Sequence, residues 1–330
     1  MRILTVSILV LFIFRCLAHE VPLINNTSSI GITGDSVDVT VPTSAGIVLM
    51  GGSKDVDAAI RWMINRASGG DFIIIRASGS TGYNDYIYSL GNVNSVETLL
   101  IDSREKALHP EVGQRIREAE AVFIAGGDQA NYVNFWSDSE VSKALSYLIK
   151  EKHIPIGGTS AGCAVLSEFI FDAKNGSVTS ANALVNPYRS EVSISKSFIA
   201  LPFLNNTITD QHYSQRDRHG RHVSFLARIA KDNGILAKGI GVDERTAVCI
   251  DELGNATVYG SNQAYFIIPD DTPENCAPNT SVDWNQNEKA LRVYSFTGSN
   301  EGTPAFNLTA WPTNNPSIYW FVEHGVLKSN

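Results

Sequence analysis

The chain has 330 residues, of which 43% are hydrophobic and 18% charged, an ordinary composition for a globular protein. This composition excludes a disordered or fibrous chain. The formal net charge is −8, and such a chain offers no basic surface to neutralise a phosphate backbone. We therefore expect no nucleic-acid partner.

Residues 1–18 have the pattern of a secretory signal peptide. Arg2 precedes an apolar run over residues 3–14, and the segment ends in a small residue at Ala18. The alternative is a membrane anchor, but the run is shorter than the roughly 20 residues that span a bilayer. We predict cleavage after Ala18 and a secreted, extracellular protein without a membrane segment, which begins with a polar leader over residues 19–43.

Asn-x-Ser/Thr triplets accompany this signal. Together with a signal peptide, such triplets predict a glycosylated product. The acceptor positions are Asn25, Asn26, Asn175, Asn205, Asn255, Asn279 and Asn307.

The cysteines that follow the predicted signal are Cys163, Cys249 and Cys276. An odd number cannot all pair internally. Cys163 lies in an apolar helical segment and Cys249 in an apolar strand-like run, which favours buried, unpaired thiols. The chain is therefore not a disulfide scaffold.

Short apolar runs alternate with helical patterns through the first half of the chain. This alternation indicates βα units that build a parallel sheet covered by helices. The predicted strands are 46–50, 72–77, 96–101, 122–125 and 154–156, with helices over 55–67 and 140–150.

The second half predicts strands separated by turns. Such strands are typical of an antiparallel extension or edge of the same sheet. No linker splits the chain, and we predict one domain over residues 44–297 with a C-terminal extension over 298–330. The predicted strands lie at 242, 246–250, 257–259, 264–268 and 291–294.

A glycine-rich turn follows the predicted strand at 154–156. Ser160 lies in the sequence GGTSAG over 157–162, where small neighbours allow a sharp bend that exposes its hydroxyl. The N–H of Ala161 is then a natural donor to an oxyanion. The alternatives are an N-cap serine and a phosphate-cradling turn, although the Lys-Ser/Thr pair of a Walker A loop is missing.

A second glycine turn, GGDQ at 126–129, ends the predicted strand at 122–125. The carboxyl ends of parallel strands meet at one edge of a sheet, so we expect this turn near Ser160. Gly127 can then donate a second N–H to the oxyanion. A purely structural role also explains this turn when it is taken alone.

A basic segment over residues 210–221 contains three arginines and two histidines. A solvated charge run is the ordinary explanation, although an exposed helix face rarely needs this concentration. A metal site at His212, His219 and His222 is a further alternative, but the spacing fits neither a helical i, i+4 pair nor a zinc signature. We expect no metal and no cofactor.

Four motifs in this order resemble the cyanophycinase and dipeptidase E family of serine peptidases, and its cyanophycinase branch in particular. The resemblance spans roughly residues 46–293. It implies a three-layer α/β/α sandwich with a mostly parallel sheet, similar to class I glutamine amidotransferases, to which the strand pattern of the second half adds a C-terminal β extension. The motifs are GGDQ at 126–129, GGTSAG at 157–162, DQH with the arginines at 210–221, and GIGVDE at 239–244.

The resemblance also implies the roles of the site residues. Ser160 is then the nucleophile, His212 the general base and Glu244 the acid that orients the base. Asp243 is a local alternative to Glu244. The arginines would bind substrate carboxylates, and Asp210 would bind a guanidinium. The implied substrate-binding residues are Gln129, Asp210, Gln211, Arg216, Arg218 and Arg221.

The implied function is that of a secreted serine exopeptidase whose partner is an acidic or β-aspartyl peptide. It would hydrolyse cyanophycin-like multi-L-arginyl-poly-L-aspartate, or other β-aspartyl peptides, to β-Asp-Arg-type dipeptides through an acyl-enzyme. The alternative is a secreted extracellular-matrix or binding protein that keeps the fold without turnover, but retention of Ser160, His212 and Glu244 argues against it. A glutamine amidotransferase needs a cysteine in place of Ser160.

Overall fold

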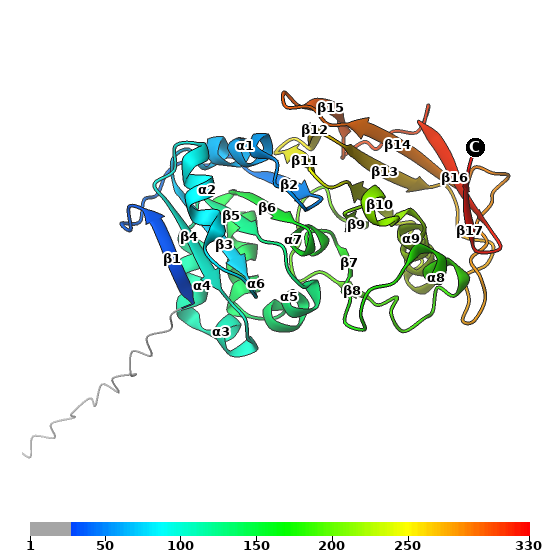
Figure 1. Cartoon of the computed structure of the whole chain (residues 1–330), viewed down its shortest axis with the longest axis horizontal. Helices are drawn as coiled ribbons and strands as arrows, with labels where there is room; N and C mark the ends of the chain where they lie inside the picture. Colours follow the sequence, from blue (N-terminus) through cyan, green and yellow to red (C-terminus); the bar gives the residue numbers. More distant parts are fainter. Residues whose placement is uncertain (1–27) are drawn as a thin grey trace, which may run out of the picture.

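Two β-sheets lie side by side along the long axis of the molecule, with helices around them (Figure 1). The computed structural model describes residues 28–330. The predicted signal peptide and the acceptor positions Asn25 and Asn26 lie outside the described residues.

The first sheet has nine strands, and its centre is the parallel sheet that the sequence predicts. In sheet order the strands are β1 (Ser29–Gly34), β4 (Ser95–Leu100), β3 (Asp71–Arg76), β5 (Ala121–Ile124), β6 (Pro155–Thr159), β2 (Gly46–Met50), β11 (Thr246–Asp251), β12 (Asn255–Gly260) and β15 (Thr303–Asn307). The five strands from β4 to β2 are parallel to one another. The strands outside them pair in the antiparallel sense.

Helices cover both faces of this sheet, because its central strands are apolar on both faces. Val48 and Met50 pack with α1 and α2, whereas Ile47 and Leu49 belong to the core that contains the apolar residues of α3 to α6. These layers confirm the predicted α/β fold. The helices are α1 (Asp57–Ala67), α2 (Gly82–Leu90), α3 (Arg104–Leu108), α4 (Pro110–Glu118), α5 (Gln129–Trp136) and α6 (Glu140–Tyr147), which continues into the π-helical turn η1 (Leu148–Lys152).

A second sheet of eight strands corrects the prediction that all the later strands extend the first sheet. In sheet order they are β17 (Val326–Ser329), β16 (Ile318–Glu323), β14 (Leu291–Thr297), β13 (Gln263–Pro269), β10 (Lys238–Val242), β9 (Thr207–Gln211), β7 (Phe169–Phe171) and β8 (Ile194–Lys196). The predicted strands at 264–268 and 291–294 lie here, while those at 246–250 and 257–259 join the first sheet. The reason is that alternation along a strand shows which side is buried but not which neighbour it pairs with.

The second sheet has a helical cover on one face and a shared core on the other. Helices α8 (Ser180–Val185) and α9 (His219–Asn233) pack on its outer face. On the other face, Ile240 and Phe266 belong to the same apolar core as Ile47 of the first sheet. The two sheets are therefore joined by a continuous core.

The predicted leader and the predicted C-terminal extension both contribute strands. β1 lies within residues 19–43 and pairs with β4. Beyond residue 297, β15 pairs with β12 and β16 pairs with β14, so this segment adds to both sheets. The domain boundaries themselves stay predictions.

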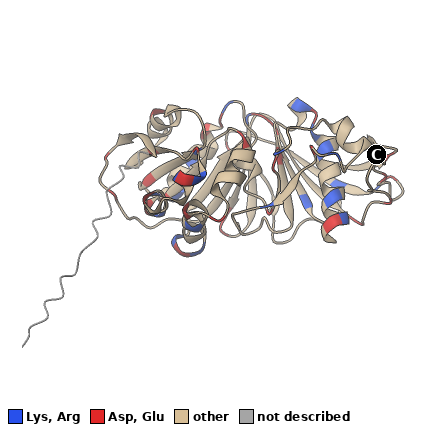
Figure 2. Ribbon diagram, turned by 90° about the horizontal axis from the view of Figure 1, so that it is seen from below, with Lys and Arg blue, Asp and Glu red and all other residues tan. Residues whose placement is uncertain are grey.

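Charged residues are interspersed over the described ribbon, with Lys and Arg among Asp and Glu (Figure 2). Within residues 28–330, the structure contains no helix with the length and hydropathy of a membrane span. Cys163 and Cys249 are buried and unpaired, as predicted, and Cys276 is also free.

Candidate active site

Ser160 lies at the tight turn after β6, at the carboxyl end of the parallel strands. Its backbone has φ 52° and ψ −119°, a conformation that non-glycine residues rarely adopt and that is typical of a strained nucleophile turn. The N–H of Ser160 donates to the carbonyl oxygen of Met50 at 3.1 Å. A Cβ on Gly162 would overlap the carbonyl group of Ile124. The small residues around Ser160 are therefore required by the bend.

His212 and Glu244 approach Ser160 from the second sheet, where they follow β9 and β10. Nε2 of His212 lies 2.8 Å from Oγ of Ser160. Nδ1 of His212 lies 2.7 Å from Oε1 of Glu244. The three side chains thus form one hydrogen-bonded series of hydroxyl, imidazole and carboxylate, as a serine triad requires.

Asp243, the local alternative to Glu244, points elsewhere. Its buried carboxylate accepts the backbone N–H of Ser214 at 2.8 Å and that of Gln263 at 3.2 Å. The structure therefore brings Glu244 against His212, while Asp243 ties two backbone segments together.

The electrostatics of the site suit a proton acceptor. Burial lowers the pKa of His212 from its ordinary 6.5, and Arg216 lowers it further, while Glu244 opposes both effects. The hydrogen bond from His212 lowers the pKa of Glu244. At neutral pH the imidazole is therefore neutral and the carboxylate ionised, which is the state in which His212 can accept the Ser160 proton.

The loop after β2 forms a wall of the site that the sequence analysis missed. The carbonyl oxygen of Gly51 accepts the N–H of His212 at 2.8 Å. Gly52 has φ 98°, and a Cβ there would lie 2.5 Å from Cε1 of His212 and 3.1 Å from Cβ of Ser160. Glycine is therefore needed at this position. The sequence feature that could have revealed this loop is the Gly51-Gly52 pair directly after a predicted strand, as in the other two glycine turns.

The predicted glycine turn at 126–129 lies beside the nucleophile. A Cβ on Gly126 would lie 3.4 Å from Cβ of Ser160. The hydroxyl of Tyr132, on α5, donates to the carbonyl oxygen of Ala125 at 2.8 Å and so supports this turn. The backbone of Gly127 is exposed next to it. Its role as an oxyanion donor stays a prediction.

Ala161 begins the helix that follows the nucleophile. This helix, α7 (Ala161–Ala164), is a single turn, shorter than the predicted segment through Leu166. The first N–H of a helix has no acceptor inside that helix. Ala161 thus offers a local donor rather than the end of a long helix dipole, and its oxyanion role also stays a prediction.

Two of the predicted substrate-binding residues bind each other. Nε and Nη2 of Arg221, on α9, donate to the two carboxylate oxygens of Asp210 at 2.7 and 2.6 Å. Arg221 is 2% exposed and Asp210 is 1% exposed. A buried bidentate pair leaves neither group free for a ligand. The expected substrate contacts of Arg221 and Asp210 are therefore corrected: the pair joins α9 to β9.

The other two arginines of the segment differ in exposure. Arg218 donates to the carbonyl oxygen of Gln211 at 2.8 Å and lies 3.5 Å from Asp210. The side chain of Arg216 is 53% exposed, and its Nε lies 4.0 Å from Oε1 of Glu244. Arg216 is therefore the arginine of this segment that a carboxylate at the site can reach.

The two predicted glutamines lie in different environments. Gln211 is 3% exposed, and its Oε1 has no hydrogen-bond partner in the described part of the chain. Thr209, on the same side of β9, bonds to the carbonyl oxygen of Cys163 next to the nucleophile turn. Gln129 donates to the carbonyl oxygen of Phe171 at 3.3 Å. Gln211 thus keeps a free acceptor, whereas the Gln129 amide links two segments.

His219 and His222 do not join His212 in a metal site. His222 is buried and contacts the hydroxyl of Tyr213 at 3.0 Å and the carbonyl oxygen of Ile208 at 3.1 Å. Burial lowers its pKa to about 4. No group of three or more His, Cys, Asp or Glu side chains within residues 28–330 is arranged to hold a metal ion.

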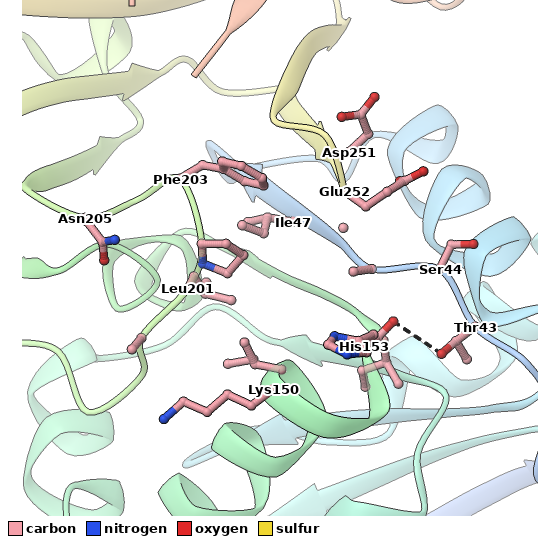
Figure 3. Close-up of a pocket in the computed structure, with 16 residues that line it drawn as sticks. Thr43, Ser44, Ile47, Lys150, His153, Leu201, Phe203, Asn205, Asp251 and Glu252 are labelled. Atoms are coloured by element: carbon pink, nitrogen blue, oxygen red, sulfur yellow. Dashed lines mark hydrogen bonds between the residues drawn. The ribbon is translucent and has the colours of Figure 1, made fainter. Parts of the chain in front are cut away.

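A cavity of about 810 Å³ lies at the other end of the first sheet (Figure 3). Ile47, Leu201 and Phe203 give it apolar walls, and Asn205 lies at its edge. β2 and β6 begin there, whereas Ser160 follows their carboxyl ends. This cavity is therefore separate from the candidate active site.

The predicted glycosylation acceptors differ in how free their amides are. Asn175, Asn205, Asn255 and Asn279 are exposed, and Asn307 is half-buried. Nδ2 of Asn307 donates to Oδ1 of Asn255 at 3.0 Å, and Nδ2 of Asn175 donates to a backbone carbonyl at 2.8 Å.

Comparison with known proteins identifies the family. The profile of peptidase family S51 matches residues 47–257. A cyanophycinase from Synechococcus elongatus is 28% identical over 189 residues, which cover 57% of this chain and 54% of that protein. A cyanophycinase from Trichormus variabilis is 26% identical over 246 residues, which cover 71% of this chain and 78% of that protein. The chain thus spans about half the length of the Synechococcus relative.

The solved structure of a peptidase from an acI-B1 Actinobacterium shares the fold. It matches with a TM-score of 0.50 at 16% identity, over 68% of this chain and 90% of that chain. The structure thus shows an α/β fold, and the matching profile is that of a peptidase family. The chain belongs to peptidase family S51, as the resemblance in the sequence predicted.

Proposed function

We propose that the chain is a serine-type peptidase in which Ser160 is the nucleophile. The observation that carries this proposal is the contact of His212 with Ser160 Oγ at 2.8 Å and with Glu244 Oε1 at 2.7 Å. Such an imidazole can take the serine proton while the carboxylate stabilises the cation that forms.

The reaction then proceeds through an acyl-enzyme. Oγ of Ser160 bonds to the scissile carbonyl carbon, and His212 passes the proton to the amine as the C–N bond breaks. Water attacks the ester in the second half, and His212 returns a proton to Ser160. The N–H groups of Gly127 and Ala161 stabilise the oxyanion in both halves.

The substrate is an acidic or β-aspartyl peptide. The exposed guanidinium of Arg216, 4.0 Å from Glu244, supports a carboxylate-bearing ligand. The resemblance in the sequence implies multi-L-arginyl-poly-L-aspartate or another β-aspartyl peptide, with β-Asp-Arg-type dipeptides as products, and the relatives named cyanophycinase support this choice.

The protein is secreted and glycosylated in this proposal. The signal pattern of residues 1–18 supports secretion. The exposed positions of Asn175 and Asn205 support their use as acceptors.

The test is hydrolysis by the purified protein. We expect it to release soluble dipeptides, identified by mass spectrometry, from insoluble multi-L-arginyl-poly-L-aspartate or from β-aspartyl oligomers. Replacing Ser160 by Ala should lower kcat by about 10⁶-fold, the loss found for a triad nucleophile in subtilisin. Replacing Ser89, an exposed serine on α2, by Ala should leave kcat unchanged. Normal activity of the Ser160→Ala variant would contradict the proposal.

A further inference from the structure

The cavity of about 810 Å³ where β2 and β6 begin has apolar walls that the proposed triad does not use (Figure 3). These walls include the exposed Ala200 and Pro202 and the half-buried Ile149 and Phe203. Contiguous apolar surface that reaches solvent usually marks a site of interaction. The volume falls within the range of about 300–1,000 Å³ that is typical of small-molecule sites. The cavity therefore has the size and character of a ligand site.

Polar side chains surround these apolar walls. Lys150, in η1, and His153, which follows it, form no side-chain hydrogen bond or ion pair with any residue in 28–330. Across the cavity, the carboxylate of Asp251 accepts the backbone N–H of Asn255 at 2.8 Å. Apolar walls with a few polar groups at the edge match a saccharide, because a sugar ring presents C–H faces between hydroxyl and acetamide groups.

Asn205, at the edge of this cavity, begins the triplet Asn205-Asn206-Thr207 (Figure 3). Phe203 lines the cavity on the same chain segment, two residues earlier, whereas Leu204 between them is buried in the core. A sugar attached to Asn205 therefore begins beside the Phe203 ring.

The Asn205 amide is also free to carry a sugar. Its side chain is exposed and forms no hydrogen bond within residues 28–330. At the other predicted acceptors of this range the amide has a partner: Nδ2 donates at Asn175, Asn255 and Asn307, and Oδ1 accepts at Asn279. Asn205 is thus the acceptor that a glycan disturbs least.

The Phe203 ring is held in place beside this acceptor. Gly254 has φ 87°, and a Cβ there would lie 3.0 Å from Cδ1 and Cε1 of Phe203. The ring therefore packs against backbone that carries no side chain. Phe203 is only half-buried, so part of the ring stays available to a ligand. An aromatic ring attracts the C–H face of a sugar through dispersion contacts.

We infer that this cavity binds the N-linked glycan of Asn205, with the first N-acetylglucosamine on the Phe203 ring. The inference rests on the secretion and glycosylation in the proposed function, and it does not depend on Ser160. The glycan covers the apolar walls that the protein alone leaves in contact with solvent. It is in this sense a part of the folded structure rather than a solvated appendage.

The covalent step precedes folding of this segment. Nδ2 of Asn205 bonds to the anomeric carbon of the sugar, the bond from that carbon to the pyrophosphate of a lipid-linked donor breaks, and the amide releases one proton. Thr207, the third residue of the triplet that the transfer reaction requires, is buried, and its hydroxyl donates to the carbonyl oxygen of Leu204 at 2.6 Å. That hydroxyl is therefore accessible only before the segment folds.

The covalent link makes a weak sugar site sufficient. A sugar tethered at the edge of the cavity has an effective concentration of about 1 mM, so a cavity that binds the free sugar with a Kd of about 0.1 mM is occupied roughly nine-tenths of the time. An enzyme that needs the unbound glycan should then release it about ten-fold more slowly.

Release of the glycan by a peptide-N-glycosidase tests the inference on the folded full chain, secreted from eukaryotic cells. Glycopeptide mass spectrometry gives the occupancy and the release rate at each acceptor. The Ala200→Trp variant fills the cavity from an exposed wall position, so release at Asn205 should become about ten-fold faster. Release at any other occupied acceptor should not change. Ala181→Trp, at an exposed position on α8, is the matched control and should leave all rates unchanged.

Removal of the acceptor should uncover the cavity. The Asn205→Gln variant should bind anilinonaphthalene sulfonate, a dye that reports exposed apolar surface, and the added Ala200→Trp substitution should abolish this binding. The Asn279→Gln variant is the matched control and should not bind the dye. Thermal unfolding should show that each variant is folded, so that dye binding reports the cavity.

The outcomes separate this inference from the proposed function. An unmodified Asn205 overturns the inference; glycans at other acceptors would leave the proposed glycosylation standing, and a chain without any glycan would refute both. A glycan on Asn205 whose release rate Ala200→Trp does not change overturns the inference alone. So does a dimer of the glycosylated protein that Ala200→Trp separates, because a second copy then fills the cavity. Peptide hydrolysis, measured independently, decides the role of Ser160.

Discussion

Arg221 donates two hydrogen bonds to Asp210 at 2.6 and 2.7 Å, although neither side chain is more than 2% exposed. Burial raises the pKa of Asp210, but Arg221 and Arg218 outweigh burial and hold it below its ordinary value. Asp210 lies on β9, two residues before His212. The ion pair therefore fixes α9 to the strand that positions the proposed base.

Loss of this pair should destabilise the fold. Replacing Arg221 by Met removes the bidentate partner of the buried Asp210 carboxylate. Such a loss typically costs about 3–5 kcal/mol in the free energy of unfolding. Urea unfolding measures this change. The Arg216→Met variant is the matched control, because Arg216 is exposed and should change stability by less than about 0.5 kcal/mol. Equal unfolding midpoints for the two variants would contradict the structural role of Arg221.

The same pair predicts a pH dependence of stability. A carboxyl group with a lowered pKa in the folded state adds stability above its unfolded pKa, about 3.9, and this stability is lost as the pH falls through the folded value. The cost of Arg221→Met should therefore be complete at pH 7 and shrink below about pH 4. Urea unfolding of both proteins across this range checks the prediction, and a cost that grows in acid is the contrary result.

The sequence predicts the first sheet better than the second for a physical reason. Continuous apolar runs such as 46–50 and 72–77 reveal strands buried on both faces, and they match β2 and β3 within one residue. β9 is also fully buried, but it contains Thr209, Asp210 and Gln211. Distant residues bind two of these side chains: Arg221 donates to Asp210, and the carbonyl oxygen of Cys163 accepts the hydroxyl of Thr209. No local pattern reveals such a strand.

The sequence predicts the positions of site residues only where a local motif determines the backbone conformation. The turn around Ser160 has a local cause in its small residues, so the sequence predicts its position. The direction of Arg221 depends on how α9 lies over the second sheet, and the spacing of arginines along the chain does not contain that information. A pocket lined by Asp55 and Arg76 likewise forms only where the loops after β2 and β3 meet at the sheet edge.

Arg216 should act on both substrate binding and the pKa of His212. Replacing Arg216 by Gln should lower kcat/KM for a carboxylate-bearing peptide by about ten- to a hundred-fold. Arg216 lowers the pKa of His212, and the reactive imidazole is neutral. The acid limb of the pH–rate profile should therefore move to higher pH in the variant. The Arg189→Gln variant, which loses a surface ion pair with Glu191, should leave both quantities unchanged, and an unmoved limb in Arg216→Gln would refute the electrostatic effect.

Substitutions of Glu244 and Asp243 should differ in effect: the first should mainly lower kcat, and the second should mainly lower the free energy of unfolding. Replacing Glu244 by Gln removes the acceptor that fixes the His212 tautomer, and the corresponding change in a serine protease lowers kcat by about 10⁴-fold. Replacing Asp243 by Asn disturbs two backbone contacts and should cost about 1–3 kcal/mol in the free energy of unfolding, with a much smaller loss of kcat. Steady-state kinetics and urea unfolding of both variants make the comparison. A larger loss of kcat from Asp243→Asn would show that the acid is misassigned.

Gly52 should be needed for the placement of His212 as well as for the loop conformation. Its φ of 98° strains any other residue, and a Cβ there would lie 2.5 Å from Cε1 of His212. Gly52→Ala should therefore displace the imidazole and lower kcat by about a hundred-fold. Gly176 supplies the matched control, because its φ of 88° carries a similar strain while nothing lies within 4 Å of a Cβ there. Gly176→Ala should lose a similar amount of stability, measured by thermal unfolding, but keep its kcat. If both variants lose activity equally, the effect arises from backbone strain and the contact with His212 has no catalytic consequence.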